Sequence, residues 1–139
     1  MARSYTEFDE MTGNILKCAY DVHTKLGHGL LENAYKECVY YKLRTSGLLV
    51  EKEKEMPLIF EGVKLECGYR IDLLVENTVV LELKSVEVLN DVHTAQVLTY
   101  MGLGSFKIGY LYSLKIDSKK PDMFLMIIRW LHRYLFSNL

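Results

Sequence analysis

The chain has 139 residues, half of them apolar and a quarter charged, with a formal net charge of −1 at pH 7. This composition excludes an intrinsically disordered chain and is typical of a globular protein that can bury one sizeable core. The near-zero charge also argues against a generic basic nucleic-acid coat, although bound metal could neutralise acidic groups at a local site. We expect one domain that spans residues 1–139.

Two helices are predicted in the N-terminal third. Apolar residues recur at helical spacing from Phe8 to Leu26, and Gly27 ends that pattern. A second helix is predicted from Leu30 to about Thr45. The three cysteines have no metal-binding spacing and no apolar leader is present. We therefore expect reduced thiols and a cytoplasmic protein that does not insert into a membrane.

From Leu48 onward the pattern changes to strands separated by turns. Asn90 or Asp91 can cap a later helix that runs to about Gly102. The predicted strands are about 48–56, 58–60, 63–75, 79–86 and 106–114. This order of helices and strands predicts an α/β or α+β layer with a mixed sheet.

The segment after Asp122 fits two patterns. Apolar residues at helical spacing favour a helix packed against the sheet, and this is the interpretation we adopt. The apolar run 123–128 alone would also suit a buried strand, and it is too short to span a bilayer.

The predicted hairpin of residues 69–84 is the most informative segment. If residues 76–78 form a three-residue turn, Asp72 lies opposite Glu82, and Lys84 shares the face of Glu82. A two-residue turn would shift the register by one and send the acids to opposite faces. Carboxylates beside apolar residues are costly to bury without compensation, and a divalent cation is the obvious compensator.

The chemistry of this trio suits a hydrated metal ion. Two carboxylates and the Leu83 carbonyl could supply three oxygens to Mg²⁺, which keeps several of its waters. Lys84 could hold or deprotonate the attacking water, or stabilise charge on a phosphate. The alternative is an ion pair on the exposed face of a hairpin, because so short a pattern also arises by chance.

Two helices carry further candidates. Glu32 falls in the first turn of its predicted helix, where the dipole favours an anion, and Tyr35 shares its face. Glu32 either completes a metal site or merely suits the dipole. On the later helix, His93, Gln96 and Tyr100 form a polar stripe that could bind phosphate or orient a lysine. A buried or solvated stripe explains this pattern equally well.

In chain order, these motifs resemble the PD-(D/E)XK nuclease superfamily and, more closely, the small bacterial and archaeal GxxExxY proteins. The resemblance covers roughly residues 8–114. The matching segments are Gly29–Tyr35, Tyr69–Val75, Val80–Lys84 and His93–Tyr100.

The resemblance implies a fold and a set of catalytic roles. The fold would be α/β, with a restriction-endonuclease-like core in which helices flank a central mixed β-sheet. Glu32 would be the helix-borne acid and Lys84 the catalytic lysine. The metal, Mg²⁺ or Mn²⁺, would be held by Glu32, Asp72, Glu82 and the carbonyl of Leu83.

A second group would face the nucleic acid. Gln96 and Tyr100 are similar to the Gln-x-x-x-Tyr motif of RecB-like and lambda-exonuclease-like members, which supports the lysine and contacts nucleic acid. Tyr35 and His93 lie in the same motifs and are expected to join them. Ile71 precedes Asp72 where the superfamily name has proline, which carries no chemistry there.

We therefore expect a metal-dependent nuclease that hydrolyses phosphodiester bonds in DNA. The alternatives are a catalytically inactive nucleic-acid-binding module and a protein-interaction subunit, the latter suggested by ten tyrosines and an apolar tail. A homodimer is a further expectation. Basic residues that could meet a nucleic-acid backbone are Lys36, Lys42, Arg44, Arg70, Lys107 and Lys115.

Overall fold

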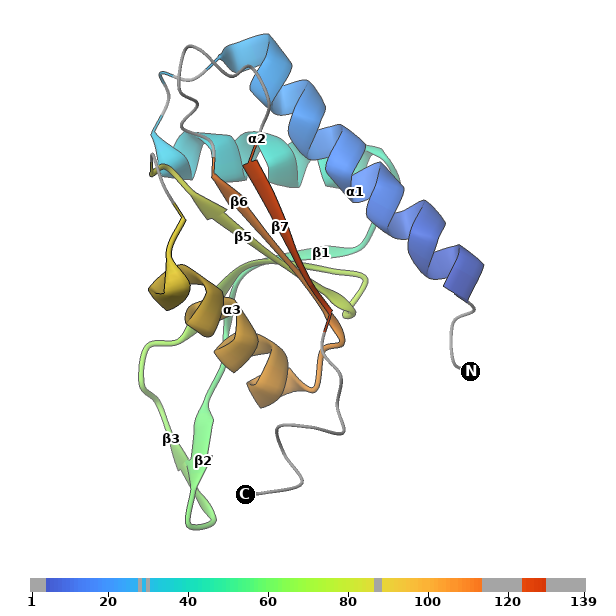
Figure 1. Ribbon diagram of the computed structural model, residues 1–139. Coiled ribbons are helices and arrows are strands. Elements are labelled where there is room, and N and C mark those ends of the chain that lie inside the picture. Colours follow the sequence, from blue (N-terminus) through green and yellow to red (C-terminus); the bar gives the residue numbers. More distant parts are fainter. Residues whose placement is uncertain (1–4, 28, 30, 87–88, 114–123, 130–139) are drawn as a thin grey trace.

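A mixed sheet forms the centre of the computed structural model, which describes residues 5–27, 29, 31–86, 89–113 and 124–129 (Figure 1). Within these residues the strand order is β1-β4-β5-β6-β7, with β5 and β6 parallel and the other neighbours antiparallel. The strands are β1 (Val50–Glu55), β4 (Arg70–Val75), β5 (Val79–Lys84), β6 (Ile108–Ser113) and β7 (Phe124–Arg129).

Helices cover both faces of this sheet (Figure 1). Helices α1 (Tyr5–Leu26) and α2 (Glu32–Thr45) share one hydrophobic core with Leu73 and Leu81. Helix α3 (Asp91–Gly104) shares the other core with Leu74 and Val80. Successive strand residues point to opposite faces, so β4 and β5 each supply both cores. The predicted α/β class, with helices flanking a mixed sheet, is confirmed.

The predicted hairpin register is also confirmed. Val75 pairs with Val79, and Leu73 pairs with Leu81, so residues 76–78 form the three-residue turn. The Thr78 N–H closes this turn by donating to the Val75 carbonyl over 3.0 Å. Glu76 and Asn77 both adopt left-handed backbone conformations there, with φ values of 53° and 50°. The same register places Asp72 opposite Glu82.

The single strand predicted over residues 63–75 is wrong, because the chain leaves the strand conformation near Gly68. Strand β3 (Val63–Leu65) pairs only with β2 (Leu58–Phe60), and these two form a small separate hairpin (Figure 1). Gly68 has a φ of 75°, a left-handed conformation that glycine adopts without steric cost. This break lets the chain turn back, so that β4 pairs with β1 instead.

The helix predicted after Asp122 is wrong for residues 124–129, which form β7. This strand pairs antiparallel with β6, from Ile108 opposite Arg129 to Ser113 opposite Phe124. An apolar run satisfies either pattern, and the free edge of β6 selects the strand because it offers unpaired backbone groups. The remaining predicted helical residues, 130–139, lie outside the described residues.

Strand β4 departs from regular alternation at Asp72. Ile71 and Leu74, three residues apart, pack in the same core with α3, whereas Leu73 faces α1 and α2. Regular alternation would put Ile71 with Leu73. The neighbouring strand is distorted at the same level, where Glu53 has a left-handed φ of 52°. The two distortions face each other and shape the site described below.

Candidate active site

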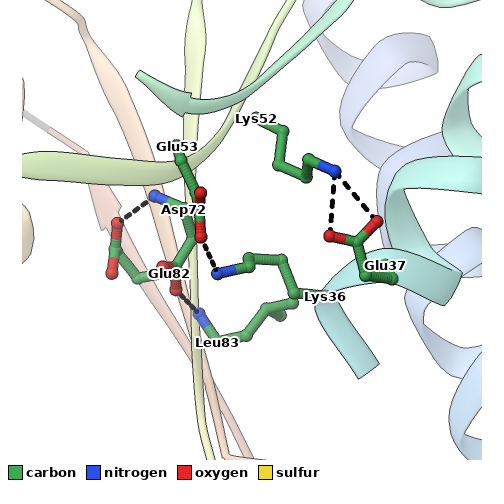
Figure 2. A network of polar contacts seen from close by, with 7 residues as sticks. All are labelled: Lys36, Glu37, Lys52, Glu53, Asp72, Glu82 and Leu83. Carbon is green, nitrogen blue, oxygen red and sulfur yellow. Dashed lines mark hydrogen bonds and ion pairs between the residues drawn. The ribbon is translucent and has the colours of Figure 1, made fainter. Parts of the chain in front are cut away.

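Asp72 and Glu82 lie side by side where β4 and β5 separate. Regular backbone pairing of the two strands ends at Leu73 and Leu81. Beyond that point the acids replace backbone acceptors. The Asp72 N–H donates to Glu82 Oε1 over 2.8 Å, and the Leu83 N–H donates to Asp72 Oδ2 over 2.9 Å (Figure 2). The side chains thus bind across the gap between the strands, which fixes both carboxylates.

Glu82 is a strongly perturbed acid. Its side chain is 1% exposed. Burial, and then the charge of Asp72, raise the pKa of Glu82 to about 9, although the backbone N–H of Asp72 and the Lys84 ammonium oppose that rise. This raised pKa means that Glu82 keeps a proton at neutral pH unless a metal ion binds. A buried, protonated carboxyl beside a second, half-buried carboxylate is a place where a metal ion can replace the proton.

Lys84 follows Glu82 by two residues on β5 and is half-buried at the end of the strand. The influence of its ammonium on the pKa of Glu82 shows that the two groups are electrostatically coupled. The structure therefore brings Asp72 and Glu82 together, with Lys84 two residues further along β5, and the role of the lysine stays a prediction.

Glu32 reaches the same end of β5 from the first turn of α2. Its Oε2 accepts a hydrogen bond from the Ser85 N–H over 2.8 Å. Ser85 directly follows Lys84, so this bond ties the start of α2 to the chain beside the lysine. Glu32 thus lies near the site but already has a backbone partner. The structure assigns it at least this anchoring role.

The polar stripe on α3 divides into two roles. Gln96 Nε2 donates to the Tyr100 hydroxyl over 3.2 Å, and the Arg70 N–H donates to the same hydroxyl over 3.4 Å. Burial, followed by the Glu82 charge, raises the pKa of Tyr100. Gln96 and Tyr100 therefore support β4, the strand that carries Asp72. His93 instead completes a capping box, since its Nδ1 accepts from the Asn90 N–H over 3.2 Å.

Two of the expected nucleic-acid contacts are buried. Tyr35 is 1% exposed and packs in the core between the sheet and α1 and α2. Tyr100 is 3% exposed. Neither ring offers surface to a strand of nucleic acid, and both contribute to the packing of the two cores instead.

Sequence reasoning missed one member of the site, Glu53, and assigned another, Lys36, only as a general basic residue. Lys36 on α2 forms a 2.8 Å ion pair with Glu53 on β1. The pKa of Lys36 is raised despite its burial, by Glu53 first and then by Asp72. Figure 2 shows the Lys36 ammonium close to the carboxylates of Glu53 and Asp72. Glu53 is one of several alternating charged residues in β1, so the sequence pattern does not single it out. No sequence signal marks its left-handed backbone.

Two of the other expected backbone contacts, Lys42 and Arg70, lie next to acids. Lys42 pairs with Asp21 at 3.4 Å, and Arg70 lies 3.7 Å from Glu55. These pairs do not concentrate positive charge on one surface. Lys115 lies outside the described residues.

A hollow of about 380 Å³ lies at the base of the β2–β3 hairpin, beside the start of β4. Tyr69 and Arg70 contribute to its wall, whereas Asp72 and Glu82 do not. The hollow therefore borders the acids along the strand and does not contain them.

Residues 9–123 match the family described as the PD-(D/E)XK nuclease superfamily. The chain belongs to this superfamily. The match covers α1 from residue 9 onward and every element from α2 to β6, including both acids and Lys84. The description of this superfamily is that of a group of nucleases.

One solved structure supports the same fold. The crystal structure of SSO0001 is similar, with a TM-score of 0.53 and 19% sequence identity over 89% of this chain. The match covers 58% of SSO0001, so this chain spans little more than half of that protein. At this identity the likeness concerns the fold alone. No curated protein matches the sequence.

PD-(D/E)XK nucleases generally use Mg²⁺ or Mn²⁺, and the site fits such an ion in part. In the described part of the chain, no three His, Cys, Asp or Glu residues are grouped to hold a metal. Asp72 and Glu82 alone provide two carboxylates, one of which retains a proton. Mg²⁺ is often bound through one or two carboxylates and keeps several waters. The pair therefore suits a hydrated ion, whereas Glu32 and the Leu83 carbonyl remain proposed ligands.

The described helices include none with the length and apolar character needed to cross a membrane.

Proposed function

We propose that this PD-(D/E)XK protein is a Mg²⁺- or Mn²⁺-dependent nuclease of the GxxExxY type that hydrolyses phosphodiester bonds in DNA. The observation that carries the proposal is the geometry of Asp72 and the buried Glu82. Each carboxylate accepts a backbone hydrogen bond from the other strand, and Lys84 follows Glu82 by two residues on β5. A carboxyl pair of this kind is energetically costly in the free protein, and functional sites concentrate such perturbed groups.

The chain's own residues would divide the work as follows. Asp72 and Glu82 would hold the ion, and Glu82 would release its proton on binding. When bound, a divalent ion supplies charge neutralisation at the phosphate and lowers the pKa of a water. Lys84 would stabilise negative charge that develops on the phosphate, as fixed cations do in other sites. Gln96 and Tyr100 would hold the strands that carry these groups.

Substitution at the acid and at the lysine tests this proposal. We expect Asp72→Asn and Lys84→Met each to lower Mn²⁺-dependent cleavage of labelled duplex DNA by about 10²–10³-fold or more. Asparagine keeps a side-chain oxygen that can accept from the Leu83 N–H, so the fold is expected to survive. Single-turnover cleavage followed on gels measures the loss.

Lys54→Met is the matched control, because Lys54 is on β1 and forms only a local ion pair with Glu51. It should cleave at the wild-type rate. Wild-type rates in both the Asp72→Asn and the Lys84→Met proteins would refute the assignment.

An inactive nucleic-acid-binding module is the second candidate. It is favoured by the bond between Glu32 and Ser85 and by the absence of a three-ligand group among the described side chains. This candidate predicts salt-sensitive DNA binding with no cleavage in any divalent metal. The same assay, run on the wild-type protein across Mg²⁺, Mn²⁺ and Ca²⁺, separates the two functions.

A further inference from the structure

Two ion pairs connect α2 to β1, and the helix supplies the lysine in one pair and the glutamate in the other. Lys36 on α2 pairs with Glu53 on β1 at 2.8 Å, and the adjacent Glu37 on α2 pairs with Lys52 on β1 at 2.9 Å (Figure 2). Both pairs join the same two elements. They differ in their surroundings, since the Lys36 side chain is 12% exposed whereas that of Lys52 is 32% exposed. Only the Lys36 pair adjoins Asp72.

Glu53 has a left-handed backbone conformation, which an ion pair between α2 and β1 does not by itself require. Lys52 and Lys54 pair regularly with Leu73 and Ile71, which places Glu53 opposite Asp72. Glu53 has a φ of 52°, a costly conformation for a residue with a side chain, whereas Lys52 forms its own ion pair without a positive φ. The strained backbone therefore brings the Glu53 carboxylate, and with it the Lys36 ammonium, to the level of the acids.

The negative charge around Asp72 and Glu82 indicates a role for the Lys36 ammonium. A phosphodiester that approaches Asp72 and Glu82 brings a negative charge toward Glu53 as well, and this set of carboxylates repels it. A lysine ammonium has three N–H donors. The described contacts of Lys36 use one of them, for Glu53. The others can meet a phosphate oxygen on the side of the acids opposite to α3.

We propose that Lys36 is a second ammonium of the site, which contacts a phosphate group of the nucleic acid, and that Glu53 is its positioning residue. The proposal deepens the proposed function, because it rests on the acids being the place where nucleic acid binds. It predicts one phosphate contact that comes from α2 and is absent from the neighbouring Lys52.

Binding under conditions that prevent turnover tests the contact directly. The probe is a short fluorescent DNA duplex, titrated with protein in Ca²⁺ and in EDTA over a range of salt concentrations. We expect Lys36→Met to weaken binding by about tenfold and to reduce the slope of log affinity against log salt by about 1, as loss of one phosphate contact requires. Lys36→Arg should restore most of the affinity and the slope.

Lys52→Met is the matched control, because it also removes one ion pair between α2 and β1. It should bind within about twofold of wild type and keep the wild-type salt slope. Glu53→Gln leaves the Lys36 ammonium in place, so it should preserve most of the salt slope that Lys36→Met loses. If the Lys36–Glu53 pair had only a structural role, Lys36→Met would lower thermal stability and keep the wild-type salt slope.

The proposal is overturned if Lys36→Met keeps the wild-type slope, if Lys52→Met reduces it equally, or if the wild-type protein does not bind the duplex. Its failure is distinguishable from failure of the proposed function. A wild-type protein that binds the duplex through Lys36 but never cleaves it in Mn²⁺ would reject the nuclease and retain the contact.

Discussion

The Glu82 carboxyl shows how one buried group can report on the state of the site. In the free protein its proton lessens the repulsion from Asp72, which a bound cation would do in its place. The proton and the cation therefore compete for the same pair of acids. Because the pKa of Glu82 differs between the folded and unfolded chain, the stability of the free protein also depends on pH.

Glu82 should make the free protein less stable as pH rises. Its pKa is about 9 in the folded protein and 4.5 in the reference state. Between these values the folded chain binds a proton that the unfolded chain does not, so the free energy of unfolding falls with rising pH, by at most about 1.4 kcal/mol per pH unit. Glu82→Gln should flatten this part of the curve in urea unfolding experiments in EDTA.

Glu66→Gln provides the comparison, because Glu66 is an exposed carboxyl between β3 and β4. Its stability curve should keep the wild-type slope. An unchanged slope in Glu82→Gln would show that the proton is not held as the geometry indicates.

Helix α3 can support the acids only if it lies close against β6, and Gly109 permits that approach. A Cβ at Gly109 would lie 2.6 Å from Met101 Sδ and 2.7 Å from Val97 Cγ1. Methionine can move its sulfur, but the β-branched valine has little freedom within a helix. The glycine therefore sets the distance between the sheet and the helix that carries Gln96 and Tyr100.

Gly109→Ala should lower the free energy of unfolding by about 1–3 kcal/mol, the usual cost of overpacking a core. Gly13→Ala is a suitable control, since a Cβ at Gly13 in α1 meets nothing within 4 Å. That change should raise stability by about 0.5–1 kcal/mol, because alanine favours a helix interior. Urea unfolding measures both, and equal stability of Gly109→Ala and wild type would mean that α3 is free to shift.

Local patterns in the sequence predict those elements whose partners are close along the chain. The turn at residues 76–78 and the cap at Asn90 are specified by a few neighbouring residues, and both are confirmed. The break near Gly68 and strand β7 depend on distant partners, β1 and β6 respectively. Glu53 depends on both its own strained backbone and Lys36 on another element, so a pattern confined to β1 cannot reveal it.

At the scale of the whole molecule, the acids lie at the level where two cores on opposite faces of the sheet meet. Leu73 belongs to one core and Ile71 to the other, and Asp72 lies between them. A ligand that binds the acids in this arrangement binds the native chain and not the unfolded one. Its binding free energy therefore adds to the stability of the entire fold.

Mn²⁺ should raise the thermal midpoint of the wild-type protein, with a gain of about 2.7 kcal/mol when the free ion is at 100 times its dissociation constant. The gain should grow as pH rises toward the pKa of Glu82, because the competing proton is released. Asp72→Asn should abolish it, whereas Glu66→Gln should keep it. Thermal unfolding at several Mn²⁺ concentrations provides the measurement, and an equal gain in Asp72→Asn would place the ion elsewhere.

The left-handed backbone at Glu53 also affects how readily strand β1 can pair with another copy of the chain. Strand β1 is the outermost strand on its side of the described sheet, and such an edge invites pairing with a strand from another copy. The left-handed residue interrupts the straight row of backbone donors and acceptors that an incoming strand would need. Charged side chains occupy the strand from Glu51 to Glu55 and oppose stacking further. The distortion that positions the Glu53 carboxylate thereby also disfavours edge-to-edge aggregation through β1.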